Sequence, residues 1–177
     1  MEQKFNQLGI DVQRWRAVDS REVQIPSDSA KCKFDNANAI YACALSHISL
    51  IRHAQQEKME YVVIFEDDIE FAPNFIEEVN KIGDDWDMFM LGGHGGYRKP
   101  RGDYFIVKEC AGTYGYVVNE VSFPHILSSW SYNLGIDELY GSWLQKVLTV
   151  KAKIPWLVNT FPNFSDVAGH YVEYDLS

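Results

Sequence analysis

The strongest pattern in the chain is a run of five apolar or aromatic residues, Tyr61 to Phe65, followed by the acids Glu66, Asp67 and Asp68. A short continuous apolar run is typical of a strand that is buried on both faces of a sheet. Open α/β sheets bind their ligands at the carboxyl ends of such strands. The pattern therefore predicts a buried strand that carries a carboxylate cluster into a ligand-binding edge.

Helix-like and strand-like patterns alternate through the first half of the chain. Helical patterns cover residues 1–8, 37–56 and 74–82, and strand-like patterns cover 12–18, 61–65 and 86–91. Gly9 stands where a helix C-terminus favours glycine, and Pro73 stands where a helix begins. Alternation of this kind predicts one α/β domain over residues 1–177, with a mixed, mainly parallel central sheet flanked by helices.

Shorter elements are predicted in the second half. Strands over 104–107 and 114–118 form a plausible antiparallel pair, and helices are expected to begin near Asn119 and near Gly135. Short strands are expected at 147–150 and 156–158, before an irregular tail from Pro162 onward. No internal repeat or linker divides the chain.

Composition and charge restrict the class of partner. The 177 residues carry a net charge of -9 and are 46% hydrophobic, which is typical of one folded domain. Nucleic acid and anionic membranes attract clustered Lys and Arg, so neither is expected as the main partner. No apolar run is long enough for a transmembrane segment. The three cysteines lack a Cys-x-x-Cys pairing, which argues against a closed zinc site and makes the cytoplasm, of the cell or of a host cell, the expected compartment.

The acidic cluster has a simple chemical interpretation. Three adjacent carboxylates repel one another unless solvent or a cation relieves the repulsion. Mg²⁺ and Mn²⁺ prefer carboxylate oxygen ligands and commonly share them with a substrate phosphate. A metal site is thus favoured over the alternative, a strand that ends in a solvated acidic turn.

Five blocks, in order along the chain, resemble glycosyltransferase family 25. They are Ala42–His47, Tyr61–Asp68, Met88–Gly92, Gly112–Val118 and Gly135–Asp137. The family includes lipopolysaccharide-type and collagen-type galactosyltransferases and related viral enzymes. The resemblance extends over roughly residues 5 to 170.

The resemblance implies a GT-A-like fold and a metal-dependent, inverting transfer of a sugar. The implied cofactor is Mn²⁺ or Mg²⁺, and the implied donor is a nucleotide sugar, most commonly a UDP-sugar carrying galactose or a related hexose. A hydroxyl of a saccharide or glycoprotein is the implied acceptor. A catalytically inactive glycan- or partner-binding module and a metal-dependent phosphohydrolase remain as alternative functions.

The metal ligands and the catalytic base follow from the same resemblance. Asp68 is the expected direct metal ligand, Glu66 belongs to the same motif, and His170 in the C-terminal segment is expected to complete the metal shell. An exposed histidine in the tail is the competing interpretation of His170. An inverting transfer needs a general base for the acceptor hydroxyl. Asp137 is expected in that role, with Glu138 as its neighbour, although Asp is also an ordinary residue at a helix N-terminus.

Contacts with the nucleotide sugar are expected from a further set of residues: Asp19, Ser46, His47, Asp67, Gly93 and His94. Asp19 would reach the nucleoside and Asp67 the ribose or donor sugar. The glycine-rich stretch around His94 would be a loop that lets backbone approach a ligand. The competing interpretations are local: a helix-terminal charge for Asp67, helix packing or capping for Ser46 and His47, and a surface turn for the glycines.

Two further features complete the expectations. Family members usually begin with a strand that helps to bind the nucleotide. In this chain Met1 is expected to stand in the helix that follows that strand. An altered donor site or an inactive module is therefore a consistent alternative. The only dense basic group, Arg98, Lys99 and Arg101, is expected in the loop after the glycines, either solvated or closing over a diphosphate.

Overall fold

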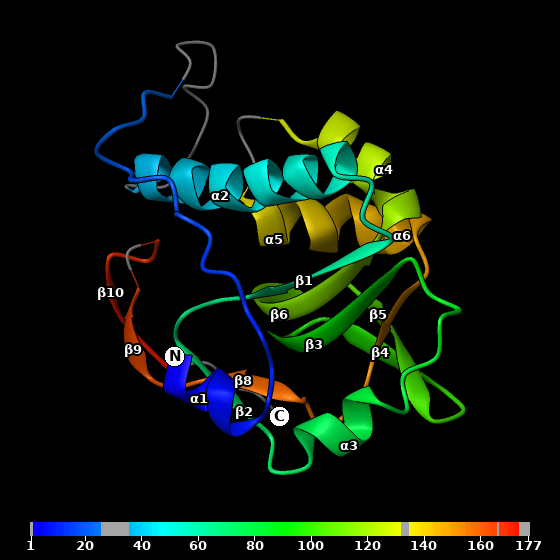
Figure 1. The fold of residues 1–177 in the computed structure, drawn as a ribbon. Coiled ribbons are helices and arrows are strands. Elements are labelled where there is room, and N and C mark those ends of the chain that lie inside the picture. The colour runs from blue at the N-terminus through cyan, green and yellow to red at the C-terminus, as the bar shows by residue number, and fades with distance from the viewer. Residues whose placement is uncertain (1, 26–35, 132–134, 166, 174–177) are drawn as a thin grey trace.

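The computed structural model describes residues 2–25, 36–131, 135–165 and 167–173, and it shows a central sheet between two covering layers (Figure 1). The six strands of the sheet, in their order across it, are β1 (Tyr61–Phe65), β6 (Ala111–Asn119), β3 (Met88–His94), β7 (Val150–Ala152), β5 (Tyr104–Lys108) and β4 (Tyr97–Arg101). An α/β fold is therefore confirmed.

Helices form the layer on one face of the sheet, and a mixture of short elements forms the layer on the other. The first layer contains α2 (Ala37–Gln56), η2 (Glu120–Ser122), α4 (Phe123–Ser129), α5 (Ile136–Leu139), the π-helical turn η3 (Tyr140–Leu144) and α6 (Gln145–Val147). The second contains α1 (Glu2–Gln7), α3 (Phe75–Val79) and the two-stranded sheet of β2 (Ile69–Phe71) and β8 (Val158–Thr160). A hairpin of β9 (Asn163–Ser165) and β10 (His170–Val172) follows β8.

The prediction of a mainly parallel sheet is wrong. Among the described strands of the central sheet, β3 and β7 are the only parallel neighbours, and the other four pairings are antiparallel. The strands β1 and β3 do run in the same direction, as the alternation of strands and helices predicts. They are not neighbours, however, because β6 lies between them and pairs antiparallel with both.

Short connections explain this topology. A parallel crossover needs a dozen or more residues, whereas two residues separate β4 from β5, so these two strands pair as an antiparallel hairpin. The expected pairing of 104–107 with 114–118 is also wrong, because β5 pairs with β4 and β7. The basic residues Arg98, Lys99 and Arg101 accordingly lie on strand β4 and not in a loop.

Each face of the sheet packs against its own hydrophobic cluster. On the α2 side the cluster includes Ile48, Ile51, Met88 and Tyr116, all nearly inaccessible to solvent. On the other side Phe5 of α1 packs with the rings of Phe65, Phe71 and their neighbours, at centroid distances of 5.3–5.4 Å. The chain therefore buries both faces of its central strands, although the outer strands are covered less completely.

The strand β1 has the predicted bounds, but it is not buried on both faces. It is an edge strand with β6 as its one neighbour, and Tyr61 and Val63 are 59% and 41% exposed. Ile64, which points toward α2, is buried. One face of the apolar run therefore packs against the α2 side of the core. On the other face only Phe65, at the end of the strand, packs against the second hydrophobic cluster.

Several local predictions are confirmed. The helix α2 begins at Ala37 and ends at Gln56, and α1 is followed by Gly9 with a φ of +66°. Asn119 caps η2 by accepting a hydrogen bond from the Val121 amide.

Two irregular segments differ from expectation. Residues 12–18 form no strand, because their contacts are with α2: the Val18 amide donates to Ser46 and the Trp15 indole donates to Ser49. The tail after Pro162, expected to be irregular, forms the β9–β10 hairpin. Neither kind of long-range pairing is visible in a local pattern.

The glycine-rich stretch is also placed differently. Gly92, Gly93 and His94 are the last residues of β3, and the turn comes afterwards at Gly95 and Gly96, where φ is +62° and +74°. A side chain at Gly92 would collide with the Val158 carbonyl, and a Cβ at Gly93 would lie 2.8 Å from the Cys110 sulfur. These two glycines are explained by close packing of the protein against itself.

We expect Gly92→Ala to destabilise the fold by roughly 2 kcal/mol or more, because the backbone of β8 must move to admit the methyl group. Gly83→Ala is the control, since its Cβ would have one neighbour at 3.9 Å and no strained backbone angle. Urea unfolding of both variants decides the matter. Equal midpoints for the two would contradict the packing role assigned to Gly92.

Candidate functional site

The three acids after β1 point to three different surroundings. The Glu66 amide donates to the Tyr114 carbonyl oxygen at 3.0 Å, which continues the pairing of β1 with β6 for one residue. Beyond this point Glu66 is half-buried and faces α2, Asp67 is exposed, and Asp68 is half-buried beside β8 and β9. The carboxylates therefore have unequal environments although they are consecutive in sequence.

Glu66 is the outer end of a buried hydrogen-bonded network. Its Oε1 lies 2.8 Å from Nε2 of His47, whose Nδ1 lies 2.7 Å from the Tyr116 hydroxyl. The Tyr140 hydroxyl donates to the Tyr116 oxygen at 3.2 Å. His47, Tyr116 and Tyr140 are each at most 6% exposed, so the network runs from the helical layer through the core to the acidic motif.

The hydrogen bonds of His47 to Cys43 and Glu66 determine the charge state of its imidazole. Burial by itself lowers the pKa of this imidazole, but its hydrogen bonds to Cys43 and Glu66 and the charges on these groups outweigh burial and raise the pKa to about 10. Protonated His47 then donates to Glu66 from Nε2 and to the Tyr116 oxygen from Nδ1. Burial raises the pKa of both tyrosines, so their hydroxyls stay neutral.

Asp68 is held by the C-terminal part of the chain. Its Oδ2 accepts hydrogen bonds from Asn163 Nδ2 at 2.5 Å and from Thr160 Oγ1 at 3.3 Å. The Thr160 hydroxyl also approaches the Asp68 carbonyl oxygen at 3.1 Å. Oδ1 has no hydrogen-bond partner among the described residues, so this oxygen can bind a ligand without breaking a contact.

His170 lies on the same hairpin, but it is not drawn into the acidic motif. It is exposed, it stands opposite Ser165 in the β9–β10 pairing, and its Nδ1 lies 2.9 Å from the Ala168 carbonyl oxygen. Asn163, on the partner strand, connects the hairpin to Asp68. The structure therefore brings the segment that carries His170 to the motif, while the imidazole itself contacts its own turn.

His94 and Asp137 both lie near the first residues of β6. The His94 Nδ1 lies 2.6 Å from the Tyr114 hydroxyl, and the two rings stack. Burial lowers the pKa of His94, and the nearby negative charge of Asp137 opposes this shift. Since the Tyr114 carbonyl also binds the Glu66 amide, one short stretch of β6 connects the acidic motif with His94.

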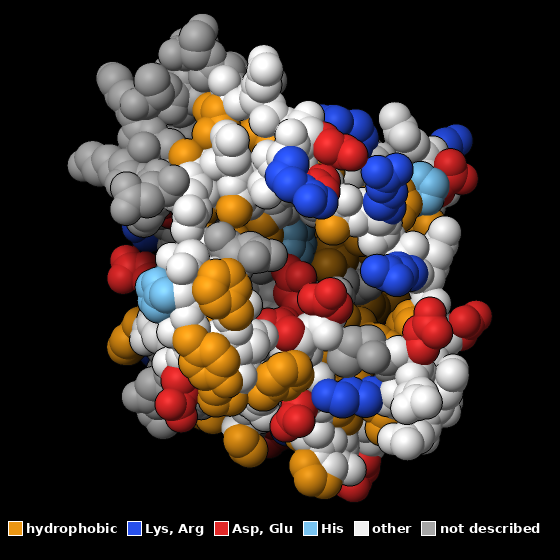
Figure 2. Space-filling model, turned by 90° about the vertical axis from the view of Figure 1, so that its left-hand side faces the viewer, with side chains coloured by type: hydrophobic (Ala, Val, Ile, Leu, Met, Phe, Trp, Pro, Cys, Tyr) orange, Lys and Arg blue, Asp and Glu red, His pale blue; other side chains and the backbone are white. Residues whose placement is uncertain are grey.

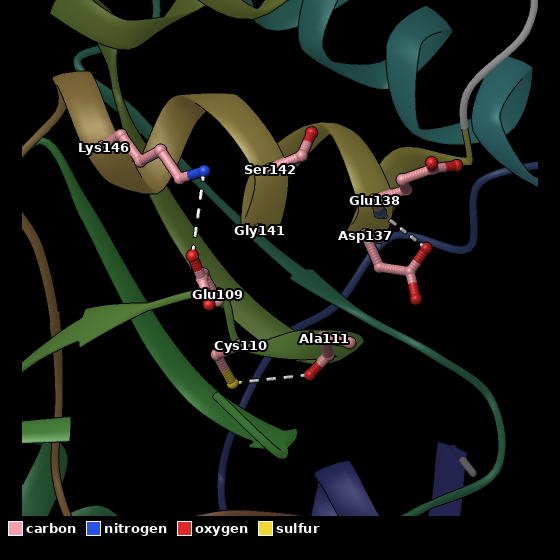
Figure 3. Close-up of a pocket in the computed structure, with 8 residues that line it drawn as sticks. All are labelled: Glu109, Cys110, Ala111, Asp137, Glu138, Gly141, Ser142 and Lys146. Atoms are coloured by element: carbon pink, nitrogen blue, oxygen red, sulfur yellow. Dashed lines mark hydrogen bonds and ion pairs between the residues drawn. The ribbon is translucent and has the colours of Figure 1, made fainter. Parts of the chain in front are cut away.

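Asp137 stands at the start of the helical stretch that begins with α5. Its Oδ1 accepts a hydrogen bond from the adjacent Glu138 amide at 2.8 Å, and the helix dipole favours an acid in this first turn. The other carboxylate oxygen has no hydrogen-bond partner among the described residues. Figure 3 shows this side chain at one end of a pocket that extends along the helix toward Lys146.

Other expected nucleotide-binding residues have contacts within the protein. Asp19 pairs with Arg21, whose hydrogen bonds lower the pKa of the carboxyl to about 2. The Ser46 hydroxyl donates to the Ala42 carbonyl oxygen and accepts from the Val18 amide. The second contact brings the segment with Asp19 to the turn of α2 that carries His47, so these candidates do lie near one another.

The arrangement of metal-binding groups differs from the expected one. Among the described residues, the His, Cys, Asp and Glu side chains that bring three donor atoms within 4.8 Å of one another are Cys43, His47 and Glu66. Glu66, Asp68 and His170 do not form such a group in this arrangement. Asp67 and the open oxygen of Asp68 nevertheless offer hard carboxylate ligands, which suit Mg²⁺ or Mn²⁺. Acidic side chains also gather beside a hollow on one face of the molecule (Figure 2).

Sequence reasoning missed the residues that hold the candidates in place. Tyr114 and Tyr116 lie within one of the blocks of family resemblance, and that was the available signal. Thr160 and Asn163 carry no local signal, because their contact with Asp68 crosses more than ninety residues of sequence.

The fold and the site define an α/β domain with a carboxylate-lined edge at the C-terminal ends of β1 and β3. Residues 1–101 match the sequence model of glycosyltransferase family 25, described as an LPS biosynthesis protein. The chain belongs to glycosyltransferase family 25. No curated protein matches it. The matched segment contains α2, the acidic motif and His94, and it ends before β6 and Asp137.

No helix in the described segments has the length and apolar character needed to cross a membrane. Of the cysteines in the described segments, Cys43 and Cys110 are free thiols. Burial raises the pKa of Cys110 to about 11, so this thiol is a poor nucleophile.

We expect Tyr116→Phe to lower the free energy of unfolding by about 1–3 kcal/mol, because His47 Nδ1 and the Tyr140 hydroxyl both lose a buried partner. Tyr97→Phe removes the same atom from a side chain that is 62% exposed, and we expect it to change stability by less than about 0.5 kcal/mol. Chemical denaturation measures both. Similar small effects would show that the network contributes little to stability.

Proposed function

We propose that this glycosyltransferase moves a hexose, galactose or a related sugar, from a nucleoside-diphosphate donor to a hydroxyl of a saccharide or glycoprotein, with inversion and with Mn²⁺ or Mg²⁺. A UDP-sugar is the proposed donor. The main support is the position of Asp67 and Asp68 directly after β1, on the same edge of the sheet as His94. Carboxyl ends of strands are where α/β sheets bind their ligands.

The proposed donor site uses the two acids that face away from the core. Asp68 keeps Oδ1 open while Thr160 and Asn163 fix its orientation through Oδ2. Asp67 is exposed beside it. When bound there, a divalent ion would neutralise the diphosphate and stabilise it as a leaving group. Glu66 contributes at most Oε2, since Oε1 is bonded to His47, and His170 would need to turn away from Ala168 to join the shell.

Asp137 is the proposed general base. In the reaction, the acceptor oxygen forms a bond to the anomeric carbon as the bond from that carbon to the diphosphate oxygen breaks. The electron pair of the broken bond leaves with the diphosphate, and the hydroxyl proton passes to the carboxylate of Asp137. The open oxygen of Asp137 and its place at the end of a pocket support this role.

The test is a transfer assay with UDP-, GDP- and dTDP-hexoses and a panel of glycoside acceptors, with Mn²⁺, Mg²⁺ or EDTA. We expect Asp68→Asn to reduce the transfer rate by at least about 100-fold, because a ligand of the metal is lost. Asp103→Asn, in the exposed turn between β4 and β5, is the matched control and should keep full activity.

Two results would count against the proposal in different ways. Full activity in EDTA together with full activity of Asp68→Asn would exclude the metal role. A folded protein that transfers no sugar and hydrolyses no donor under any condition would favour an inactive binding module, and release of phosphate from simple phosphate esters would favour a phosphohydrolase.

A further inference from the structure

A pocket of about 320 Å³ lies between the helical stretch from Asp137 to Lys146 and the corner where β5 passes into β6. Figure 3 shows the two walls of the pocket: the helical stretch that carries Asp137, Gly141 and Lys146 lies on one side, and Glu109, Cys110 and Ala111 lie on the other. Its volume is at the lower end of the range for small-molecule sites, which is about 300–1,000 Å³.

The buried Gln145 side chain joins the two walls, because it accepts a hydrogen bond from the Cys110 amide and donates one to the Cys110 carbonyl oxygen, both at 2.8 Å. At Gly141 the helix approaches the strand corner so closely that a Cβ would lie 3.2 Å from the Cys110 carbonyl oxygen. At one end Lys146 reaches across to Glu109 at 3.7 Å. Asp137 stands at the other end, as Figure 3 shows. The pocket is therefore bridged at the lysine end, and the candidate base lies at the opposite end.

The polar groups of the pocket suit a ligand that is rich in hydroxyl groups. Carboxylates accept hydrogen bonds from hydroxyls, and the Ser142 hydroxyl can both donate and accept. The charge balance is negative, because Glu109, Asp137 and Glu138 stand against Lys146, which is itself paired with Glu109. Burial raises the pKa of the Cys110 thiol and the positive charge of Arg98 lowers it, but the Arg98 side chain lies over the Trp156 ring and is not part of the pocket lining. Such a surface repels anionic ligands.

We propose that this pocket is the acceptor subsite and that it selects a neutral saccharide over an acidic one. The inference rests on the proposed function, because it is the base role of Asp137 that makes a neighbouring pocket the place for the acceptor hydroxyl. It adds a substrate class, since uronic acids, sialylated chains and phosphorylated sugars are disfavoured at this position. The three carboxylates exclude them without any direct steric block.

The first experiment asks whether the pocket binds saccharides. Saturation-transfer NMR is recorded on the full chain with two matched pairs of p-nitrophenyl β-glycosides, the glucoside with the glucuronide and the galactoside with the galacturonide. Each pair differs only in having a hydroxymethyl group or a carboxylate at C6. We expect at least one neutral member to bind, and its acidic counterpart to bind at least tenfold more weakly.

Variants place the binding in the pocket. Ser142 lines the pocket and is exposed, so Ser142→Trp adds bulk at the pocket edge without disturbing the core. The same change at the exposed Ser128 of α4, outside the pocket, is the control. We expect Ser142→Trp to abolish the glycoside signal and Ser128→Trp to retain it. Glu138→Gln should reduce the preference for the neutral member to threefold or less.

Each contrary result has a definite meaning. Equal binding by the Ser142→Trp and Ser128→Trp proteins, or no binding of any glycoside to the wild-type chain, overturns the pocket as the acceptor subsite. An acidic member that binds as well as its neutral counterpart overturns the proposed selectivity. Sugar transfer and donor hydrolysis test the proposed function separately, so a pocket that binds glycosides in a chain that neither transfers sugar nor hydrolyses the donor would identify a saccharide site and refute the transferase mechanism.

Discussion

The hydrogen bond between His47 and Glu66 connects the hydrophobic core to the edge of the sheet where the acids lie. His47 is held at both ring nitrogens, and Tyr116 in turn is bonded to Tyr140 in the helical layer. A buried imidazolium needs a nearby anion. This requirement keeps the Glu66 side chain pointing toward the core. The direction of Glu66 then leaves the following two acids to face the solvent side and the C-terminal segment.

The strand β6 has a comparable effect on the sheet. It separates β1 from β3, and both of these end beside its first residues. Tyr114 near the start of β6 bonds to Glu66 through its carbonyl oxygen and to His94 through its hydroxyl. A single strand inserted antiparallel between two others therefore brings together groups that are separated by almost thirty residues in sequence.

Local patterns predicted what local physics determines. The bounds of α2 and β1, the glycine after α1 and the acidic motif all follow from periodicity, propensity or a run of like residues. Other features depend on segments that are distant in sequence, and no local pattern encodes them. They are the strand partners, the exposed face of β1, and the hydrogen bonds of Asp68 to Thr160 and Asn163. For the same reason Gly92 and Gly93 suggested a ligand loop, whereas they pack against Val158 and Cys110.

Three adjacent carboxylates would repel one another strongly if all three side chains pointed into the same region. In this chain the cost is already divided: Glu66 is neutralised by His47, and Asp68 accepts hydrogen bonds from Thr160 and Asn163 on one oxygen. What remains for a ligand to neutralise is the exposed Asp67 and the open oxygen of Asp68. The Asp67 and Asp68 carboxylates together carry two negative charges, which one divalent cation would balance. The motif therefore suits a single cation better than a cluster of cations, because Glu66 is bonded to His47, whereas Asp67 and Asp68 keep oxygens open to a ligand.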